Sequence, residues 1–172
     1  GSSQRAHLML DKADVVVCLD ADPLEGHPEA NRLQRDWASR RRIDSPDPSQ
    51  QQLSRVYSVE GRLSITGMMA DDRLVARPGD VAAVATSIAR GIGMDLGFLD
   101  ELSDTATIEG LDEEILASII KDLDSHRGSS VVIAGDGQPP TVHALAAAIN
   151  SCTRTCSEQP PRSLFGIPHA AR

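Results

Sequence analysis

The chain of 172 residues is long enough to form one domain of ordinary size with a buried core. Hydrophobic residues make up 40% of it and aromatic residues only 2%, so the core has to be built from Ala, Val, Leu and Ile. The net charge of -8 excludes a general electrostatic attraction to nucleic acid or to anionic lipid. No apolar run approaches the roughly 20 residues that span a bilayer, so we expect no insertion of this chain into a membrane.

The first part of the chain predicts two strands separated by a helix. An apolar run at residues 13–22, closed by acidic residues, is typical of a central parallel strand that is covered on both faces. The following helix has Pro28 in its first turn and ends at the basic residues 40–42, which we expect to be a solvated cap that favours the helix dipole. Residues 43–54 are a predicted loop, and residues 55–61 are the second strand. The expected apolar face of the helix consists of Ala30, Leu33, Trp37 and Ala38.

The second part predicts three helices and one more strand. Residues 64–80 are expected to form a turn, a brief extended segment and the start of an alanine-rich helix that ends in glycines. A further helix over residues 112–129 has acidic residues at its positive end and the basic residues His126 and Arg127 at its negative end. The apolar strand at residues 130–135 then leads to a helix with Pro139 or Pro140 in its first turn. The apolar face of this last helix consists of Val142, Leu145, Ala146 and Ile149.

This order of elements predicts an α/β fold, a three-layer domain with a mainly parallel sheet and helices on both faces. The strands at residues 15–19 and 131–134 are both expected to be buried. Residues 1–6 are interpreted as a cloning remnant and lead-in, and residues 7–150 as the domain. Residues 151–172 lose the periodicity and collect prolines, which predicts a poorly ordered tail.

The cysteines do not predict a metal site. Cys18 lies within the first apolar strand and is expected to be a core residue. Cys152 and Cys156 form a C-x3-C pair without a second pair, so they lack the four ligands of a closed zinc or iron–sulfur site. We expect free thiols at these two positions, with a disulfide between them as the alternative.

Two turns at the expected carboxyl ends of strands carry residues suited to a ligand. Asp20 and Asp22 lie where open α/β sheets bind ligands, but no third acidic side chain completes a cation site. The GDGQPP turn contains Gly135 and Gly137 but has Pro140 where the dinucleotide fingerprint has its third glycine. We interpret it as a simple tight turn, with a ligand bound by its backbone N–H groups as the alternative. No catalytic constellation is predicted.

The resemblance to a known family rests on the order of segments along the chain. The most similar segments are ADVVVCLDAD, SITGMMADDR and QPPTVHALAAAIN. Over roughly residues 7–150 this order resembles the α/β domain of the molybdopterin oxidoreductase family of formate dehydrogenases and dimethyl sulfoxide reductases. The resemblance is closest to the large iron–sulfur subunit of the alternative complex III group of quinol-oxidising respiratory assemblies. The positions that match the family pattern are Pro23, His27, Pro28, Thr66, Ala70, Asp71, Arg77, Pro78, Gly79 and Asp80.

The resemblance implies a non-catalytic structural domain of an iron–sulfur, molybdopterin-oxidoreductase-like subunit. That subunit would belong to a membrane-associated respiratory electron-transfer complex on the periplasmic side and carry its iron–sulfur clusters in another region. The domain itself would hold no cofactor, and its partners would be other domains and subunits of the complex. Where catalytic members bind the guanine dinucleotide of the pterin with G-x-N-P and V-D-P-R, this chain has DADP and VEGR. Asp20 and Asp22 would therefore place negative charge beside an anionic cofactor.

The main alternative is a pterin-dinucleotide-binding domain of an active molybdopterin oxidoreductase, with the cofactor at the carboxyl ends of the strands. A nucleotide-binding domain of the kind found in thiamine-dependent enzymes is a third interpretation, which rests on shared architecture alone. The candidate cofactor-binding residues of the main alternative are Asp20, Asp22, Glu60, Asp80, Gly135 and Gly137.

Overall fold

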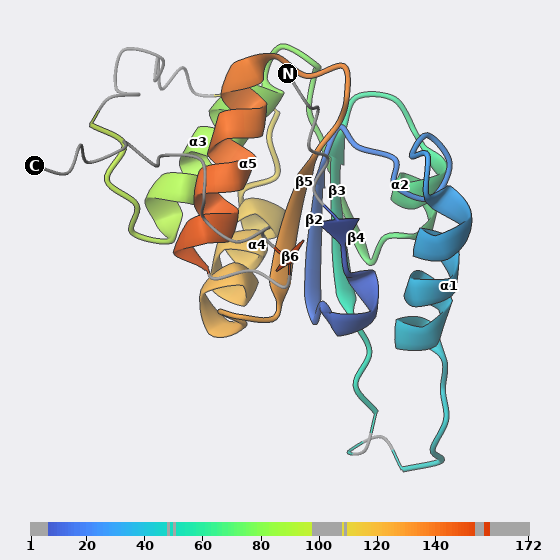
Figure 1. The fold of residues 1–172 in the computed structure, drawn as a ribbon. Coiled ribbons are helices and arrows are strands. Elements are labelled where there is room, and N and C mark those ends of the chain that lie inside the picture. Colours follow the sequence, from blue (N-terminus) through green and yellow to red (C-terminus); the bar gives the residue numbers. More distant parts are fainter. Residues whose placement is uncertain are drawn as a thin grey trace, which may run out of the picture.

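The main sheet consists of four parallel strands in the order β4-β3-β2-β5 (Figure 1). The computed structural model describes residues 7–47, 49, 51–97, 108, 110–153 and 157–158. β2 is central, as predicted, and its register places Val17 beside Tyr57 of β3 and Val132 of β5. The strands are β2 (Val15–Leu19), β3 (Arg55–Glu60), β4 (Asp72–Val75) and β5 (Ser130–Ala134).

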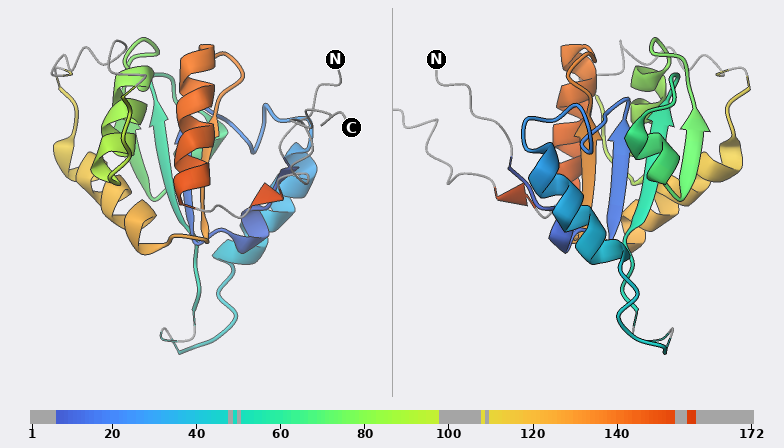
Figure 2. Two further views of the ribbon diagram at one scale, coloured as in Figure 1. Left: turned by 60° about the vertical axis from the view of Figure 1, so that its left-hand side comes forward. Right: turned by 90° about the vertical axis from the view of Figure 1, so that its right-hand side faces the viewer.

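Helices cover both faces of this sheet, which confirms the predicted three-layer α/β fold (Figure 2). One face packs against α3 (Val81–Gly91), α4 (Glu113–Ser125) and α5 (Pro140–Cys152). The other face packs against α1 (Ala30–Arg41) and the short 3-10 helix η1 (Leu10–Lys12). A five-residue helix, α2 (Ile65–Met69), lies between β3 and β4 along the chain. No helix within these described ranges is both long enough and apolar enough to cross a membrane.

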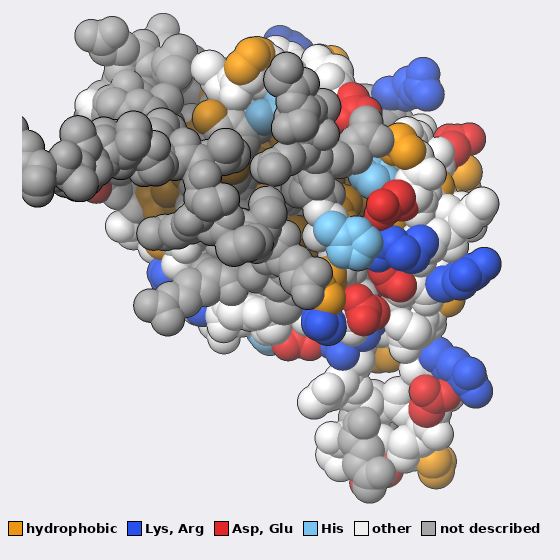
Figure 3. Space-filling view, in the orientation of Figure 1, with side chains coloured by type: hydrophobic (Ala, Val, Ile, Leu, Met, Phe, Trp, Pro, Cys, Tyr) orange, Lys and Arg blue, Asp and Glu red, His pale blue; other side chains and the backbone are white. Residues whose placement is uncertain are grey.

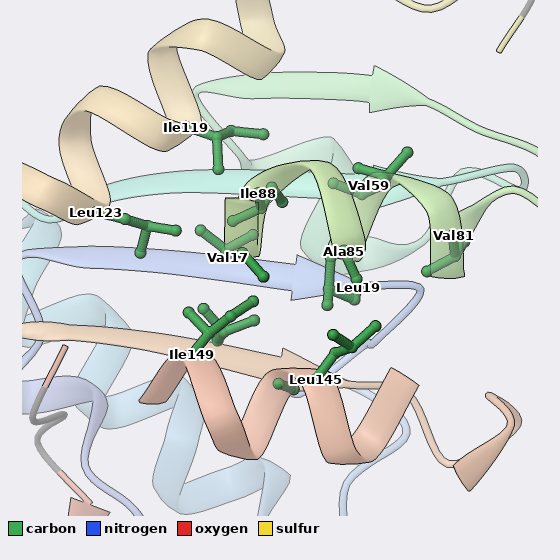
Figure 4. Packing of buried hydrophobic residues seen from close by; sticks show 14 of the residues in the cluster. Val17, Leu19, Val59, Val81, Ala85, Ile88, Ile119, Leu123, Leu145 and Ile149 are labelled. Atoms are coloured by element: carbon green, nitrogen blue, oxygen red, sulfur yellow. The ribbon is translucent and has the colours of Figure 1, made fainter. Parts of the chain in front are cut away.

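The larger core lies between the sheet and helices α3, α4 and α5 (Figure 4). Val17 of β2 packs in this cluster with Ile88 of α3, Leu123 of α4 and Ile149 of α5, and all four side chains are fully buried. The predicted apolar face of the last helix is confirmed, because Val142, Leu145, Ala146 and Ile149 are its buried residues. Aliphatic side chains therefore fill this core almost alone, as the scarcity of aromatic residues requires.

The second core lies between the sheet and α1. Val16 and Cys18 of β2 reach it because successive side chains of a strand point to opposite faces. They pack in one cluster with Leu33 and Trp37, which are four residues apart and so lie on the same side of α1. The expectation that Ala38 belongs to this face is wrong: Ala38 is exposed, since the helix turns it away from the stripe that Leu33 and Trp37 define.

The starts of α4 and α5 agree with the sequence, whereas the start of α1 does not, and α4 ends at Ser125, before the expected end. Asp112 caps α4 by accepting hydrogen bonds from the backbone N–H groups of Glu114 and Ile115, both at 3.1 Å. Pro140 occupies the first turn of α5, where its missing N–H costs nothing. Pro28 precedes α1, which begins only at Ala30, so its expected place in the first helical turn is wrong.

Two expected boundaries shift in the structure. The segment expected to be a turn and a brief extended stretch forms α2 and a paired strand, β4. Helix α5 continues through Cys152, beyond the expected domain end at residue 150. Ser157–Glu158 (β6) then pairs antiparallel with His7–Leu8 (β1). Residues 1–6, 154–156 and 159–172 lie outside the described residues, as does most of the predicted tail.

The basic cluster at residues 40–42 is held by ion pairs, which corrects the expectation of a simply solvated cap. Arg40 forms an ion pair with Asp14. Arg41 lies 2.6 Å from the Asp71 carboxylate and stacks over the ring of Trp37. Basic and acidic side chains adjoin each other on this side of the molecule (Figure 3). The cluster therefore ties the end of α1 to neighbouring loops.

We expect the replacement Ile149→Ala to lower the free energy of unfolding by about 2–5 kcal/mol, because it leaves a cavity in the larger core. The same change at Ile43, which is 76% exposed, serves as the matched control and should alter stability by less than about 0.5 kcal/mol. Chemical denaturation measures both. Equal effects of the two replacements would contradict the described core.

Candidate functional site

The sheet has one topological switch point, between β2 and β5. The chain proceeds from β2 outward through β3 to β4 and then returns to the other side of β2 with β5. Ligands of open α/β sheets bind in the crevice that such a reversal creates at the carboxyl ends of the strands. A pocket of about 120 Å³ lies at this place, and its lining includes Asp20, Asp22, His27, Gly135 and Asp136.

Asp20 fixes the first side of this pocket. Its backbone has a φ of 50°, the left-handed region that few residues other than glycine adopt. The backbone N–H of Asp20 donates to the Val59 carbonyl at 2.7 Å, and the Gln138 side chain donates from Nε2 to Asp20 Oδ2 at 2.7 Å. Asp20 therefore joins the ends of β2 and β3 to the start of α5.

Gly135 fixes the second side of the pocket by its lack of a side chain. A Cβ atom at this position would lie 1.9 Å from the backbone oxygen of Asp20, far inside any van der Waals contact. The Gly135 N–H also donates to the Leu19 carbonyl at 2.9 Å, which extends the β2–β5 pairing beyond the strand end. Gly137, the second glycine of the turn, has open space at its Cβ position. Only the first glycine of GDGQPP is thus required by close packing.

The carboxylate of Asp22 accepts hydrogen bonds from other parts of the protein itself. Its Oδ1 accepts hydrogen bonds from the Thr66 hydroxyl at 2.6 Å, from the Thr66 N–H at 3.3 Å and from the Glu25 N–H at 3.3 Å. Its Oδ2 accepts from the Ile65 N–H at 3.3 Å. These donors belong to the first turn of α2 and to the loop after β2. Asp22 is therefore an internal link between two segments that are more than 40 residues apart in the sequence.

The carboxylate of Glu60, at the end of β3, also binds other residues of the protein, and Glu60 is not part of the pocket lining. Its side chain is 2% exposed and lies 2.7 Å from Arg73 Nε, while the Ser64 hydroxyl donates to it at 2.6 Å. Burial acts to raise the pKa of Glu60, but the hydrogen bonds from Ser64 and Arg73 outweigh it, so the pKa falls below its usual range. Gly67 lies directly over this carboxylate: a Cβ there would be 2.0 Å from Glu60 Oε1.

The structure thus brings together only half of the six candidate cofactor-binding residues. Asp20, Asp22 and Gly135 line the pocket, whereas Glu60 lies on the neighbouring strand in its own ion pair. Asp80 is the N-cap residue of α3 and is not part of the pocket lining, and its side chain makes no capping hydrogen bond. Gly137 is not part of the pocket lining. The sequence analysis did not single out Gln138, because its partner Asp20 is 118 residues away and no local pattern relates them.

The thiols of the described residues do not add a reactive group to this site. Cys18 is fully buried, and burial together with the nearby charges of Asp22 and Glu60 raises its pKa far above the usual range. Cys152 is a half-buried free thiol, and Cys156 lies outside the described residues. No group of three or more His, Cys, Asp or Glu side chains in the described ranges is arranged to hold a metal ion.

Comparison of the chain with protein-family models and with curated protein sequences finds no match.

Replacing Gly135 by Ala should lower the free energy of unfolding by about 1–3 kcal/mol or more, because the added methyl group meets the backbone of Asp20. Gly137→Ala is the matched control, with open space around it, and should be neutral or stabilising by up to about 1 kcal/mol. Thermal or chemical unfolding distinguishes the two variants. A Gly135→Ala variant as stable as the control would show that the two strand ends do not approach as described.

The Glu60→Gln variant should be less stable than the wild type at pH 7 by about 1–3 kcal/mol, the value typical of hydrogen bonds to charged groups. The folded-state pKa of Glu60 is lowered, so its stabilising effect is complete above the pKa of the unfolded chain. That effect begins to weaken as the pH falls to the unfolded-state pKa of about 4.3 and is lost below the lower folded-state pKa, where the variant should converge with the wild type. Glu25→Gln, at an exposed position, is the control. A difference that does not depend on pH would contradict an ionised, paired Glu60.

Proposed function

We propose that this chain is a non-catalytic structural domain of an iron–sulfur, molybdopterin-oxidoreductase-like subunit in a membrane-associated respiratory electron-transfer complex. One observation carries the structural, non-catalytic part of the proposal: the carboxylates at the ligand-binding edge of the sheet hold the protein's own segments together. The kind of subunit and of complex is proposed from the sequence resemblance. Asp22 accepts three hydrogen bonds from the start of α2 and a fourth from the Glu25 N–H, and Glu60 is buried against Arg73. Side chains engaged in this way serve the fold and contribute no reacting group.

The pocket at the switch point is also a poor match for a dinucleotide. Its volume of about 120 Å³ is well below the roughly 300–1,000 Å³ of typical small-molecule sites. Asp20, Asp22 and Asp136 place negative charge around it, which opposes a diphosphate. The two prolines at the start of α5 remove N–H donors from the helix end that would otherwise receive a phosphate.

The alternative function is a pterin-dinucleotide-binding domain of an active molybdopterin oxidoreductase. The position of the pocket supports it, since the pocket lies at the switch point where α/β sheets bind nucleotides. In that case Asp20, Asp22 and Gly135 would contact the cofactor. Such binding would require the loop after β2 to release the hydrogen bonds that Asp22 now makes with α2.

Thermal unfolding in the presence of GDP, GTP, NAD or FAD tests this choice. A ligand at about 100 times its dissociation constant stabilises the folded state by roughly 2.7 kcal/mol. For a domain of this size each kcal/mol raises the melting temperature by about 2–4 °C. The structural role predicts no such rise with any of the four ligands. A reproducible, saturable rise with one of them would overturn the proposal in favour of the nucleotide-binding alternative.

A further inference from the structure

A group of apolar side chains is exposed in the turn between β3 and α2, on α2 itself and at the end of β4. Met68 is 69% exposed and Val75 is 60% exposed. Large apolar side chains that gather on one face mark a site of interaction with another molecule. We name this surface the α2–β4 face; its apolar residues are Leu63, Ile65, Met68, Met69 and Val75.

Glu60 brings the segments of the α2–β4 face together. The Glu60 carboxylate lies under Gly67 of α2, and Val75 of β4 is the register partner of Glu60 in the sheet. The turn after β3 reaches the same place, because a Cβ on Gly61 would lie 2.9 Å from the backbone oxygen of Ala76. The exposed residues of α2, of the turn and of the end of β4 therefore lie around the ion pair of the buried Glu60 with Arg73.

β4 adds an open sheet edge to this surface. β4 ends the main sheet, and no other strand of the described chain pairs with its outer side (Figure 2). The Ala76 N–H donates inward to the Glu60 carbonyl at 3.2 Å. Because N–H groups alternate between the two sides of a strand, the N–H of Val75 points outward. The face thus offers free backbone groups beside apolar side chains.

The charge at the rim of the α2–β4 face differs from that of the whole chain. Arg62 and Arg77 are both exposed, and neither forms an ion pair with any residue in the described ranges. Three nearby carboxylates, those of Glu60, Asp71 and Asp72, are already paired, with Arg73, Arg41 and Arg55 respectively. Asp80 is a further carboxylate near Arg77, and its backbone N–H donates to the Arg77 carbonyl at 2.8 Å. In a chain of net charge -8, two unpaired cations beside an apolar surface favour an acidic partner.

We propose that the α2–β4 face binds an extended, acidic and apolar segment of a partner polypeptide, which adds to the sheet as a strand beside β4. The backbone of the segment pairs with the outer edge of β4, its apolar side chains cover Met68 and Val75, and its carboxylates approach Arg62 and Arg77. Addition of a strand to an open edge is a common way for proteins to recognise extended peptides. This inference rests on the proposed structural role, because it names the surface through which the domain contacts its neighbours.

A fluorescein-labelled, capped eight-residue peptide of alternating valine and glutamate serves as the probe, and its binding to the whole chain is followed by fluorescence anisotropy. Saturable binding is expected. Val75→Pro removes the outward N–H without removing an inward hydrogen bond and should abolish binding. Met68→Glu and Arg62→Glu should each weaken binding about tenfold or more, through lost apolar contact and reversed charge. Circular dichroism confirms that each variant is folded.

The controls repeat the same changes elsewhere on the surface. Ile43→Glu introduces a carboxylate at an exposed apolar residue of the long loop, and Arg35→Glu reverses an exposed charge on α1. Both should bind the peptide as the wild type does, and a valine–lysine peptide should not bind. Absence of saturable binding, or binding that Val75→Pro leaves intact, would overturn the inference. So would self-association that Val75→Pro abolishes, because it would assign the face to a second copy of the chain. None of these outcomes bears on nucleotide binding, which the thermal unfolding experiment tests separately.

Discussion

The contact between Gly135 and the backbone of Asp20 determines how the carboxyl edge of the sheet is built. A side chain at residue 135 would lie 1.9 Å from the Asp20 oxygen, so β2 and β5 can approach this closely only with glycine there. At this contact the backbone of Asp20 lies in the left-handed region, and its carboxylate accepts a hydrogen bond from Gln138. The pocket of about 120 Å³ is lined by both residues of the contact. The geometry of the candidate site thus follows from one close backbone approach.

The acidic residues Asp22 and Glu60 at this edge form hydrogen bonds and an ion pair within the protein itself. In an open α/β sheet, side chains after the strands usually face a ligand. In this chain Asp22 is used to start α2, and Glu60 is buried under Gly67 with Arg73 as its counter-ion. These links hold α2 against the end of β3. They also lie next to the exposed apolar side chains of the α2–β4 face, the surface that we propose for a partner.

The main elements could be predicted from the sequence because their signals are local. The continuous apolar run of β2, the Asp112 cap of α4 and the apolar face of α5 each lie within one stretch of residues. The expected burial of the strand at residues 131–134 is confirmed for residues 131–133, although this strand, β5, ends the sheet, and Ala134 is half-buried. β4 was missed as a paired strand because it has only four residues, of which Leu74 alone is fully buried.

The site was less predictable because its contacts are distant in sequence. Asp22 and Thr66 are 44 residues apart, and Asp20 and Gln138 are 118 residues apart. Asp20 and Asp22 are both acidic residues that follow β2. Asp22 accepts hydrogen bonds from the first turn of α2, whereas the backbone of Asp20 packs closely against Gly135 of a different turn. Only the three-dimensional register of the strands reveals that Glu60 belongs to an ion pair with Arg73 and not to the pocket.

The central claim is that the switch-point pocket serves the fold and holds no dinucleotide. Its most direct test is a titration of the ¹⁵N-labelled chain with GDP, followed through the backbone amide signals of Ala21, Gly135 and Asp136, which line the pocket. The structural role predicts that these signals do not move in a saturable way. Saturable shifts confined to these amides would contradict the account and assign the pocket to a guanine nucleotide.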